Sequence, residues 1–356
     1  MEQRNRGVDL LRMVAMWMVV ILHILNKGGA LGASAPLSAG RETALLLDMA
    51  AYCAVDCYGM ISGYVGAGHR FRYSGAVALW LRTAFYTLLI TAAFAAFLPG
   101  SVNGDRVLRA FFPVLFRQYW YVTAYFGMCL FIPFFNLLLE RLTRRQAKVL
   151  ALSLVLIFSL LPTLRQGDVF LTDNGYSALW LSCLYLLGGI LRLHGRSVRK
   201  PVRWAAVYGL CVLATWLVKL AGDRLWMSRT GQLCDKVLLT AYTSPTILLA
   251  AVALLLYFAE LRIGRAFGTF IDKASPLAFS AGLPENGDAR SLQRHTGGRA
   301  GLYERILLNS INSLTAKAAV FGKTNAAAFY ERSSVNSFCS AGCRQDLCAN
   351  LFAGSG

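Results

Sequence analysis

The stretch "DLLRMVAMWMVVILHIL" at residues 9–25 decides the fold class of this chain. It is apolar over a length that suits a membrane-crossing helix, yet it carries Asp9, Arg12 and His23. Ionisable side chains are rare within membrane spans because hydrocarbon does not solvate them, and those that occur usually serve a function. The segment therefore predicts a helix that crosses a bilayer and also contributes polar groups to a site.

Composition extends this prediction to the whole chain. Of its 356 residues, 56% are hydrophobic and 15% are charged, whereas soluble proteins carry roughly 25% charged residues. The apolar residues come in blocks, several of which reach the roughly 20 residues needed to cross about 30 Å of hydrocarbon. We expect an all-α polytopic transmembrane bundle of about eight spans, at residues 8–27, 43–67, 76–98, 118–139, 148–163, 176–193, 202–220 and 237–260.

The formal net charge of +18 has two possible meanings. A strongly basic chain can bind nucleic acid, but here the Lys and Arg residues lie between the apolar blocks, where they set membrane topology. With the N-terminus inside, the inner segments hold 17 of these residues and the outer segments hold 10. The pattern predicts a cytoplasmic N-terminus and no nucleic-acid partner.

The nine cysteines do not indicate a disulfide framework, because six of them lie in or beside apolar runs. In such positions Cys serves as a small hydrophobic residue. Cys53 and Cys57 are one helical turn apart, but two thiols without a third or fourth ligand favour packing over metal binding. We therefore expect no metal cofactor.

Helical geometry arranges the polar residues of the first span as a stripe. Eleven steps of 100° bring His23 back to within about 20° of Arg12, roughly 16 Å further along the axis. Asp9 precedes Arg12 by three residues and can pair with it. A neutral imidazole at residue 23 can accept a proton from a hydroxyl group and later return it. The alternative is a histidine at the outer interface that only makes hydrogen bonds.

Two further segments add candidate site residues. "DMAAYCAVDCYGMISGYVGAG" at 48–68 holds Asp56, which can orient an imidazole, pair with an arginine or simply line a solvated cavity. In the same segment, Gly63 permits close helix approach and Ser62 can bond between helices. "RQYWYVTAYFGMCLFIPFF" at 117–135 opens with aromatic residues. An interfacial belt is their default interpretation, and the lining of a substrate pocket is the alternative; the residues concerned are Trp120, Tyr121 and Tyr125.

Taken together, these segments resemble the membrane acyltransferase-3 family, which includes bacterial O-acetyltransferases of cell-surface polysaccharides. The family's first helix carries a basic residue, ten further residues and then a histidine, as Arg12 and His23 do in "VDLLRMVAMWMVVILH". "CYGMISGYV" resembles the second-helix motif that ends in Ser-Gly-Tyr, and "QYWYVTAYFGMCLFIPFFN" resembles the opening of the fourth helix. The resemblance covers roughly residues 5–279.

The resemblance implies an enzyme of the bacterial inner membrane that moves an acyl group, usually acetyl from acetyl-CoA, to a hydroxyl of an envelope glycan or lipid-linked sugar. His23 would be the general base or a transient acyl carrier, with Asp56 as a further catalytic group. Arg12 would meet the CoA phosphates or orient the thioester, since its planar fork of donors suits phosphate. Arg70 and Arg72 would help to hold CoA, and the substrate pocket would be lined by Asp9, Ser62, Gly63, Tyr64, Trp120, Tyr121 and Tyr125.

The chain departs from the family after "SPLAF" at 275–279. Family members have about ten spans and continue there into another apolar helix, whereas this chain continues with "SAGLPENGDARS". We divide the chain into a membrane acyltransferase-like domain at 1–279 and an atypical polar tail at 280–356, which is either a loosely ordered cytosolic segment or the product of a lost reading frame. In the second case the chain is an inactive, truncated relative.

The main rival function is a membrane transporter or flippase of an envelope precursor. Buried ionisable residues also mark substrate and ion pathways, but transporters tend to have inverted repeats and matching broken helices. No internal repeat is visible, and the polar groups cluster in the first two spans. A non-catalytic sensing domain is a second rival. The sequence leaves open the identity of the acceptor and the oligomeric state.

Overall fold

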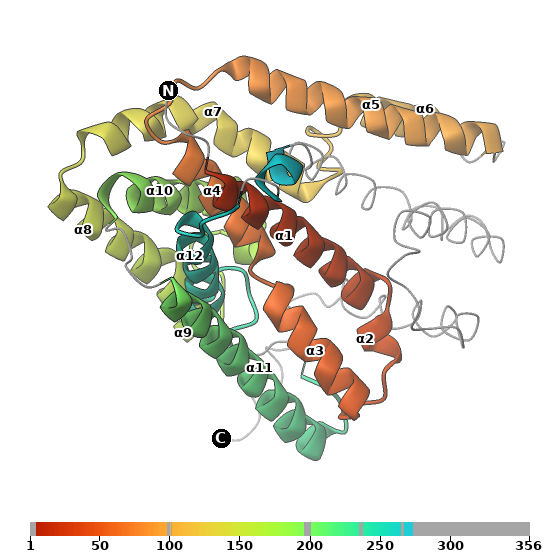
Figure 1. Cartoon of the computed structure of the whole chain (residues 1–356). Helices are drawn as coiled ribbons and strands as arrows, with labels where there is room; N and C mark the ends of the chain where they lie inside the picture. Colours follow the sequence, from red (N-terminus) through yellow and green to blue (C-terminus); the bar gives the residue numbers. More distant parts are fainter. Residues whose placement is uncertain are drawn as a thin grey trace, which may run out of the picture.

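The computed structural model describes residues 5–97, 100, 102–195, 201–234, 238–264 and 267–272. The predicted tail at 280–356 lies outside these residues. In the described part the chain is a bundle of helices without a strand, which confirms the all-α class (Figure 1).

The α-helices are α1 (Arg6–Leu22), α2 (Ala30–Ala33), α3 (Ala39–Ala51), α4 (Ala54–Gly66), α5 (Tyr73–Phe97), α6 (Gly104–Phe111), α7 (Trp120–Arg141), α8 (Arg144–Val155), α9 (Leu161–Arg165), α10 (Ala178–His194), α11 (Val202–Thr230) and α12 (Pro245–Ala259). Two π-helical segments, η1 (His23–Lys27) and η2 (Leu156–Leu160), continue α1 and α8, and a 3-10 turn, η3 (Asp173–Gly175), precedes α10.

Six helical stretches among the described residues are long and apolar enough to cross a membrane. They are Arg6–Lys27, Ala39–Gly66, Tyr73–Phe97, Trp120–Arg141, Arg144–Arg165 and Val202–Thr230. The two remaining predicted spans coincide with α10, of 17 residues, and α12, of 15 residues. All eight predicted spans therefore fall on helices, although α10 and α12 are shorter than the roughly 20 residues that cross a bilayer unaided.

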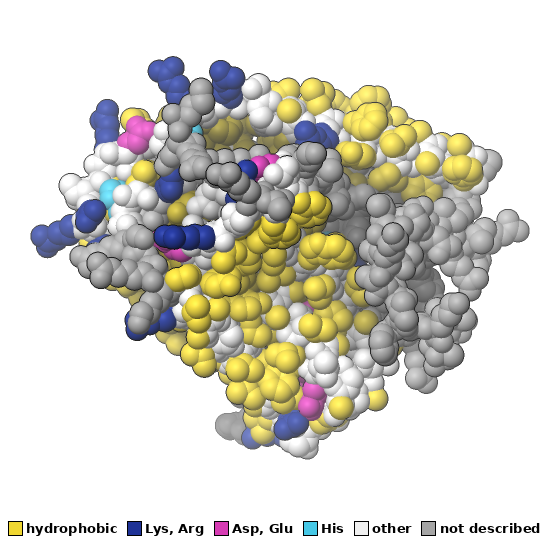
Figure 2. Space-filling model, in the orientation of Figure 1, with side chains coloured by type: hydrophobic (Ala, Val, Ile, Leu, Met, Phe, Trp, Pro, Cys, Tyr) yellow, Lys and Arg dark blue, Asp and Glu magenta, His cyan; other side chains and the backbone are white. Residues whose placement is uncertain are grey.

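The outward face of α5 has the character of a lipid-facing surface. Leu81, Phe85 and Leu89 follow one another at a spacing of four residues and are each more than half exposed, at 54%, 61% and 55%. Thr83 and Thr87 lie on the opposite, buried side of the same helix. A helix at a water interface has the reverse pattern, with polar residues outside. Figure 2 shows hydrophobic side chains over α5 and over the centre of the same face of the bundle.

The backbones of α4 and α10 are in direct contact, and glycines make this contact possible. Gly59 and Gly63 lie four residues apart on α4, the spacing that lets membrane helices approach closely. A Cβ on Gly63 would lie 1.9 Å from the carbonyl oxygen of Tyr185, and one on Gly188 would lie 2.1 Å from that of Met60. The two backbones therefore touch directly, and no side chain fits between them.

The second predicted span is not one helix, which corrects the expectation of a single helix at 43–67. It breaks at Tyr52 and Cys53, between α3 and α4. A break at membrane depth frees backbone carbonyls, which must find other partners. The hydroxyl of Tyr208 on α11 donates to the carbonyl of Ala50 at 2.8 Å and satisfies one of them.

The predicted helix at 237–260 begins later than expected, at Pro245. The ring of this proline fixes a backbone angle that suits the first helical position, and proline needs no amide partner there. The residues before it form turns instead, with Thr243 and Ser244 buried. These turns carry Tyr242 into the interior, where it packs against the rings of Tyr52 and Tyr176.

Contacts define two ends of the bundle. At one end, the Asn5 side chain donates to the carbonyl of Ala259 at 2.9 Å, and the guanidinium of Arg6 pairs with Asp272 at 2.8 Å. At the other end, Arg224 of α11 pairs with Glu42 of α3 at 2.9 Å. In Figure 2 the Lys and Arg side chains gather mainly towards the end where the N-terminus lies. That this end faces the cytoplasm remains a prediction from the sequence.

We expect Gly188→Ala to destabilise the protein, because its methyl group would displace the backbone of Met60. Overpacking of this kind costs about 1–3 kcal/mol. Gly209→Ala on α11 is the matched control, since a Cβ there has nothing within 4 Å. Thermal unfolding in detergent should show a lower midpoint for Gly188→Ala and an unchanged or slightly higher one for Gly209→Ala. Equal midpoints for both variants would contradict the backbone contact.

Candidate functional site

The first helix begins with a cap that fixes its register. The side-chain oxygen of Asn5 accepts hydrogen bonds from the amides of Gly7 at 3.0 Å and Val8 at 3.2 Å. One turn later, the guanidinium of Arg12 pairs with the carboxylate of Asp9 at 2.8 Å. The Asp9 side chain is 4% exposed and that of Arg12 is 32% exposed. The predicted ion pair is confirmed, and it holds Arg12 near the surface of the bundle.

The helix between Arg12 and His23 supports the predicted stripe. α1 runs without interruption from Arg6 to Leu22, and His23 still has helical backbone angles of φ −67° and ψ −44°. The eleven-residue register is therefore kept, with a separation of roughly 16 Å along the axis. His23 is partly buried and is the first residue of the π-helical turn η1. Such widened turns are rare in helices and are frequent at functional sites.

Hydroxyl groups from α4 and α7 gather beside Arg12. The Tyr58 hydroxyl donates to the carbonyl of Arg12 at 2.9 Å, and its ring lies edge-on to Tyr121 with centroids 6.3 Å apart. The Ser62 hydroxyl lies 3.3 Å from that of Tyr125, whose ring stacks on Tyr121. The hydroxyl of Tyr121 is buried and finds no hydrogen-bond partner in the part of the chain that the structure describes. An unpartnered buried hydroxyl is costly, so this cluster suits a polar ligand.

The aromatic residues at the start of α7 pack against other aromatic rings of the bundle. The Trp120 ring contacts Tyr176 and Tyr242, with centroids 4.4 Å and 6.2 Å apart. Tyr242 in turn stacks on Tyr52 at 4.7 Å. Tyr52 stands at the break between α3 and α4. The rings therefore line the interior between the broken span and the loops that precede α10 and α12.

Asp56 has a partner that the sequence did not predict. Its side chain is fully buried, and its Oδ1 accepts a hydrogen bond from the indole nitrogen of Trp180 at 3.0 Å. The sequence left open an imidazole partner, an arginine partner or a solvated cavity around Asp56, and the structure places Trp180 of α10 against it. Among the described residues the second oxygen, Oδ2, has no hydrogen-bond partner, so one oxygen of this buried carboxyl is unsatisfied there.

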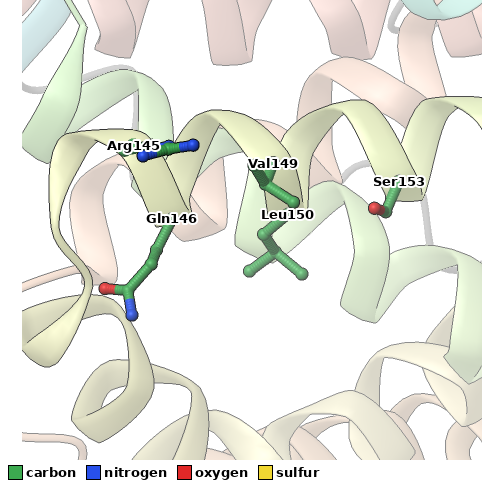
Figure 3. A pocket seen from close by; sticks show the side chains of 5 residues that line it. All are labelled: Arg145, Gln146, Val149, Leu150 and Ser153. Carbon is green, nitrogen blue, oxygen red and sulfur yellow. The ribbon is translucent and has the colours of Figure 1, made fainter.

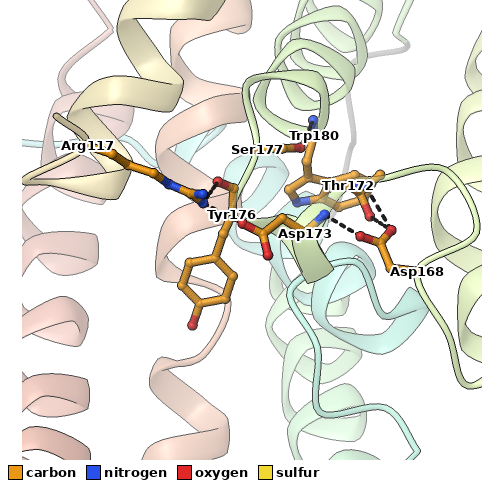
Figure 4. Close-up of polar contacts among 7 residues, drawn as sticks. All are labelled: Arg117, Asp168, Thr172, Asp173, Tyr176, Ser177 and Trp180. Atoms are coloured by element: carbon orange, nitrogen blue, oxygen red, sulfur yellow. Dashed lines mark hydrogen bonds and ion pairs between the residues drawn. The ribbon is translucent and has the colours of Figure 1, made fainter. Parts of the chain in front are cut away.

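A structured loop before α10 sets the position of Trp180 (Figure 4). Asp168 accepts hydrogen bonds from the amide of Thr172 at 2.8 Å and from its hydroxyl at 2.7 Å. Arg117, which precedes α7, forms an ion pair with Asp173 of the same loop. The hydroxyl of Ser177 then caps α10 by accepting from the amide of Trp180 at 3.2 Å. The loop ties α7 to the start of α10 and so fixes the indole against Asp56.

The remaining predicted residues lie apart from this interior cluster. Gly63 contacts the backbone of α10, and Tyr64 lies under the guanidinium of Arg192, 5.4 Å from the ring centroid. Arg70 and Arg72 are exposed in the connection between α4 and α5. This connection lies at the same end of the bundle as the start of α1, because α1 and α4 run antiparallel through the contact of Tyr58 with Arg12.

Three residues of the site were missed from the sequence: Tyr58, Trp180 and Tyr242. Each is an aromatic residue in an apolar run, which is the ordinary composition of a membrane helix. The position of Tyr58, two residues after a buried acid, offered a weak signal. The positions of Trp180 and Tyr242 offered none, because their contacts depend on how distant helices pack.

A surface hollow of about 370 Å³ lies away from these residues, along α8 (Figure 3). Its described lining residues are Arg145, Gln146, Val149, Leu150 and Ser153. None of them was predicted from the sequence to belong to the site. The site therefore rests on the contacts among α1, α4, α7 and α10 and not on this hollow.

Comparison with known families gives one match. The family model Acyl_transf_3, described as "Acyltransferase domain", matches residues 5–275. This range holds all the candidate residues of the site. No curated protein and no solved structure matches the chain.

We expect Trp180→Phe to destabilise the protein by about 1–3 kcal/mol, because it leaves both oxygens of a buried carboxyl without a donor. Adding Asp56→Leu should recover part of this loss, since removing both partners leaves no orphaned polar group. Trp17→Phe is the control, because Trp17 is 57% exposed on α1. Thermal unfolding of the four proteins provides the measurement, and a double variant less stable than Trp180→Phe would refute the hydrogen bond's role.

Proposed function

Since the chain belongs to the acyltransferase-3 family, we propose that it is an integral membrane enzyme that moves an acyl group, acetyl by preference, from acyl-CoA to a hydroxyl. The observation that carries this proposal is the paired Asp9 and Arg12 on the same membrane-length helix as His23. Keeping three ionisable residues on one span is costly unless they act together. Transfer of an acyl group from a donor on one side of the membrane to an acceptor on the other side would use all three of these residues.

The reaction requires one base and no change of oxidation state. The acceptor hydroxyl loses its proton to the imidazole of His23 while its oxygen attacks the thioester carbonyl carbon. The new C–O bond forms, the C–S bond breaks, and the departing CoA sulfur takes the proton back from the imidazolium. The products are an ester and free CoA thiol. General-base catalysis of this kind contributes about 10²–10⁴-fold to a rate.

Basic residues at the end of the bundle that holds the N-terminus suit the CoA moiety of the donor. Arg12 is partly exposed, and Arg70 and Arg72 are exposed at the same end. Guanidinium groups bind phosphate through paired donors. We propose that Arg70 and Arg72 contact the phosphates, and that Arg12, held by Asp9, contacts the donor further in. The extended pantetheine arm would then run along α1 towards His23.

The hydroxyl cluster and the aromatic rings suit the reacting end of the donor and the acceptor. Ser62, Tyr121 and Tyr125 lie beside Arg12, and the unpartnered hydroxyl of Tyr121 supports a polar ligand there. Trp120 continues this lining towards the broken span. Gly63 and Tyr64 would shape the pocket indirectly, by keeping α4 against α10.

Asp56 is proposed as a catalytic carboxyl because Oδ2 is buried and unpartnered. In this position it can accept a hydrogen bond from the acceptor hydroxyl or from an imidazolium formed during transfer. Its bond to Trp180 fixes the direction of that oxygen. A buried, half-satisfied carboxyl is expensive, and a substrate contact explains why it is kept.

The proposed setting is the bacterial inner membrane. Membrane lipid surrounds the apolar helices, acetyl-CoA arrives from the cytoplasm, and the acceptor is an envelope glycan or a lipid-linked sugar. No metal and no nucleic acid enters this scheme.

A transporter remains the second candidate because the break between α3 and α4 is a feature of transport proteins. The two functions differ in a simple way. A transporter moves its substrate unchanged, whereas the enzyme leaves a labelled ester on the acceptor and releases CoA.

The decisive variant is His23→Ala, which should lower acetyl transfer from labelled acetyl-CoA in membranes by at least about 100-fold, because the proton acceptor is lost. His194→Ala, at the end of α10, is the matched control and should keep the parent activity. Protein level and unfolding midpoint should match the parent in both variants. Equal labelling by the parent protein and His23→Ala would remove the enzyme assignment.

A separate prediction concerns the donor. Arg70→Gln with Arg72→Gln should raise the KM for acetyl-CoA and leave kcat within about twofold, because exposed charges attract the phosphates without touching the reacting atoms. The difference from the parent should shrink as salt rises, since salt screens exposed charges. Arg109→Gln, an exposed ion-paired residue on α6, is the control. A KM that is unchanged at low salt would place the CoA phosphates elsewhere.

A further inference from the structure

The helix that carries His23 changes geometry at that residue. Within η1 the backbone widens, and the amide of Gly28 donates to the carbonyl of His23 at 2.8 Å, five residues back. In a π-helical turn the hydrogen bonds join residues five apart, whereas in an α-helix they join residues four apart. Such turns are rare and occur mostly as single turns within α-helices. The direction of the imidazole therefore depends on whatever holds this turn in place.

Asn26 ties the widened turn to a neighbouring helix. Its side-chain nitrogen donates to the carbonyl of Leu22 at 3.1 Å and to the Oδ1 of Asp48 at 2.6 Å. The first contact bridges the junction between α1 and η1, and the second reaches across to α3. One side chain thus joins the start of the turn to a neighbouring helix.

Asp48 is a buried acceptor for the Asn26 side chain, since it is only 4% exposed. The charge of Lys219 on α11 also attracts Asp48, but it has less effect than burial or the Asn26 hydrogen bond. Lys219 itself forms its ion pair with Asp223 at 2.7 Å and donates to the carbonyl of Cys234 at 2.7 Å. The hydrogen bond from Asn26 therefore joins η1 to Asp48 of α3.

We propose that Asn26 and Asp48 are positioning residues that hold the imidazole of His23 in its reactive direction, an inference that rests on the proposed function. Neither residue touches the reacting atoms in this scheme. Asp48, and not Asp56, is the acid that reaches the turn of His23. Asn26 and Asp48 act on His23 through the backbone of η1. Loss of their hydrogen bond therefore leaves donor binding intact but changes the direction of the His23 imidazole.

The test is steady-state transfer from labelled acetyl-CoA to the endogenous acceptor by the full chain in native membranes. Asn26→Ala and Asp48→Ala should each lower kcat by about 10-fold to 100-fold with an unchanged KM, because small displacements of a reacting group are costly. The double variant should lose no more than the worse single variant, since both remove the same hydrogen bond. Asp48→Asn keeps an acceptor oxygen and should recover most of the kcat lost in Asp48→Ala.

Controls separate positioning from general stability. Asp105→Ala removes an exposed ion pair on α6 and should keep the parent kcat. Asn26 is exposed, so Asn26→Ala leaves the core unchanged and tests the inference even where Asp48→Ala fails to fold. The rate at which diethyl pyrocarbonate modifies His23, followed by mass spectrometry, should change in Asn26→Ala at an unchanged unfolding midpoint.

The outcomes distinguish this inference from the function on which it rests. If Asn26→Ala and Asp48→Ala keep the kcat of the parent protein while His23→Ala is inactive, the positioning role is overturned and the enzyme assignment stands. Additive losses in the double variant would overturn it as well. Full activity in His23→Ala would overturn both.

Discussion

Direct backbone contact between α4 and α10 is the constraint on which the rest of the structure depends. Gly63 and Gly188 each face a carbonyl of the opposite helix at a distance that excludes even a methyl group. In a bilayer the hydrophobic effect does not press helices together, so close packing and interhelical hydrogen bonds must do so. This contact brings Trp180 to Asp56 and the Tyr185 hydroxyl to Asn136 at 2.7 Å. Asn136 in turn donates to the carbonyl of Gly66 at the end of α4.

The polar residues of the site follow from this arrangement. With α4 fixed, Tyr58 reaches the backbone of α1 beside Arg12, and Ser62 reaches Tyr125 on α7. The break between α3 and α4 then turns Tyr52 into the aromatic cluster and leaves Asp48 facing η1. Arg12 and His23 thus lie on a helix that is fixed by three contacts. These are the Asn5 cap, the hydrogen bond of Tyr58 to the Arg12 carbonyl and the hydrogen bond of Asn26 to Asp48. Asp9 and Arg12 are accommodated in this apolar setting because they pair with each other.

The sequence was a good guide to whatever depends on short-range pattern. Each of the eight predicted apolar blocks overlaps a helix in the described part of the chain, and a spacing of three residues predicted the pair of Asp9 with Arg12. It was a poor guide to contacts between distant segments. Nothing local distinguishes Trp180 from other membrane tryptophans, and the break at Tyr52 lacks the proline that usually marks one. The late start of α12 differs from these cases because it depends on a local feature. Pro245 suits the first position of a helix and marks where α12 begins.

The most direct measurement of the central claim is photoaffinity labelling with a photoreactive acyl-CoA, followed by identification of the labelled peptides. We expect labelling of α1 between Arg12 and His23 and of the facing parts of α4 and α7, all abolished by excess CoA. Labelling confined to the outward face of α5 or to the hollow along α8, with the same sensitivity to CoA, would contradict it.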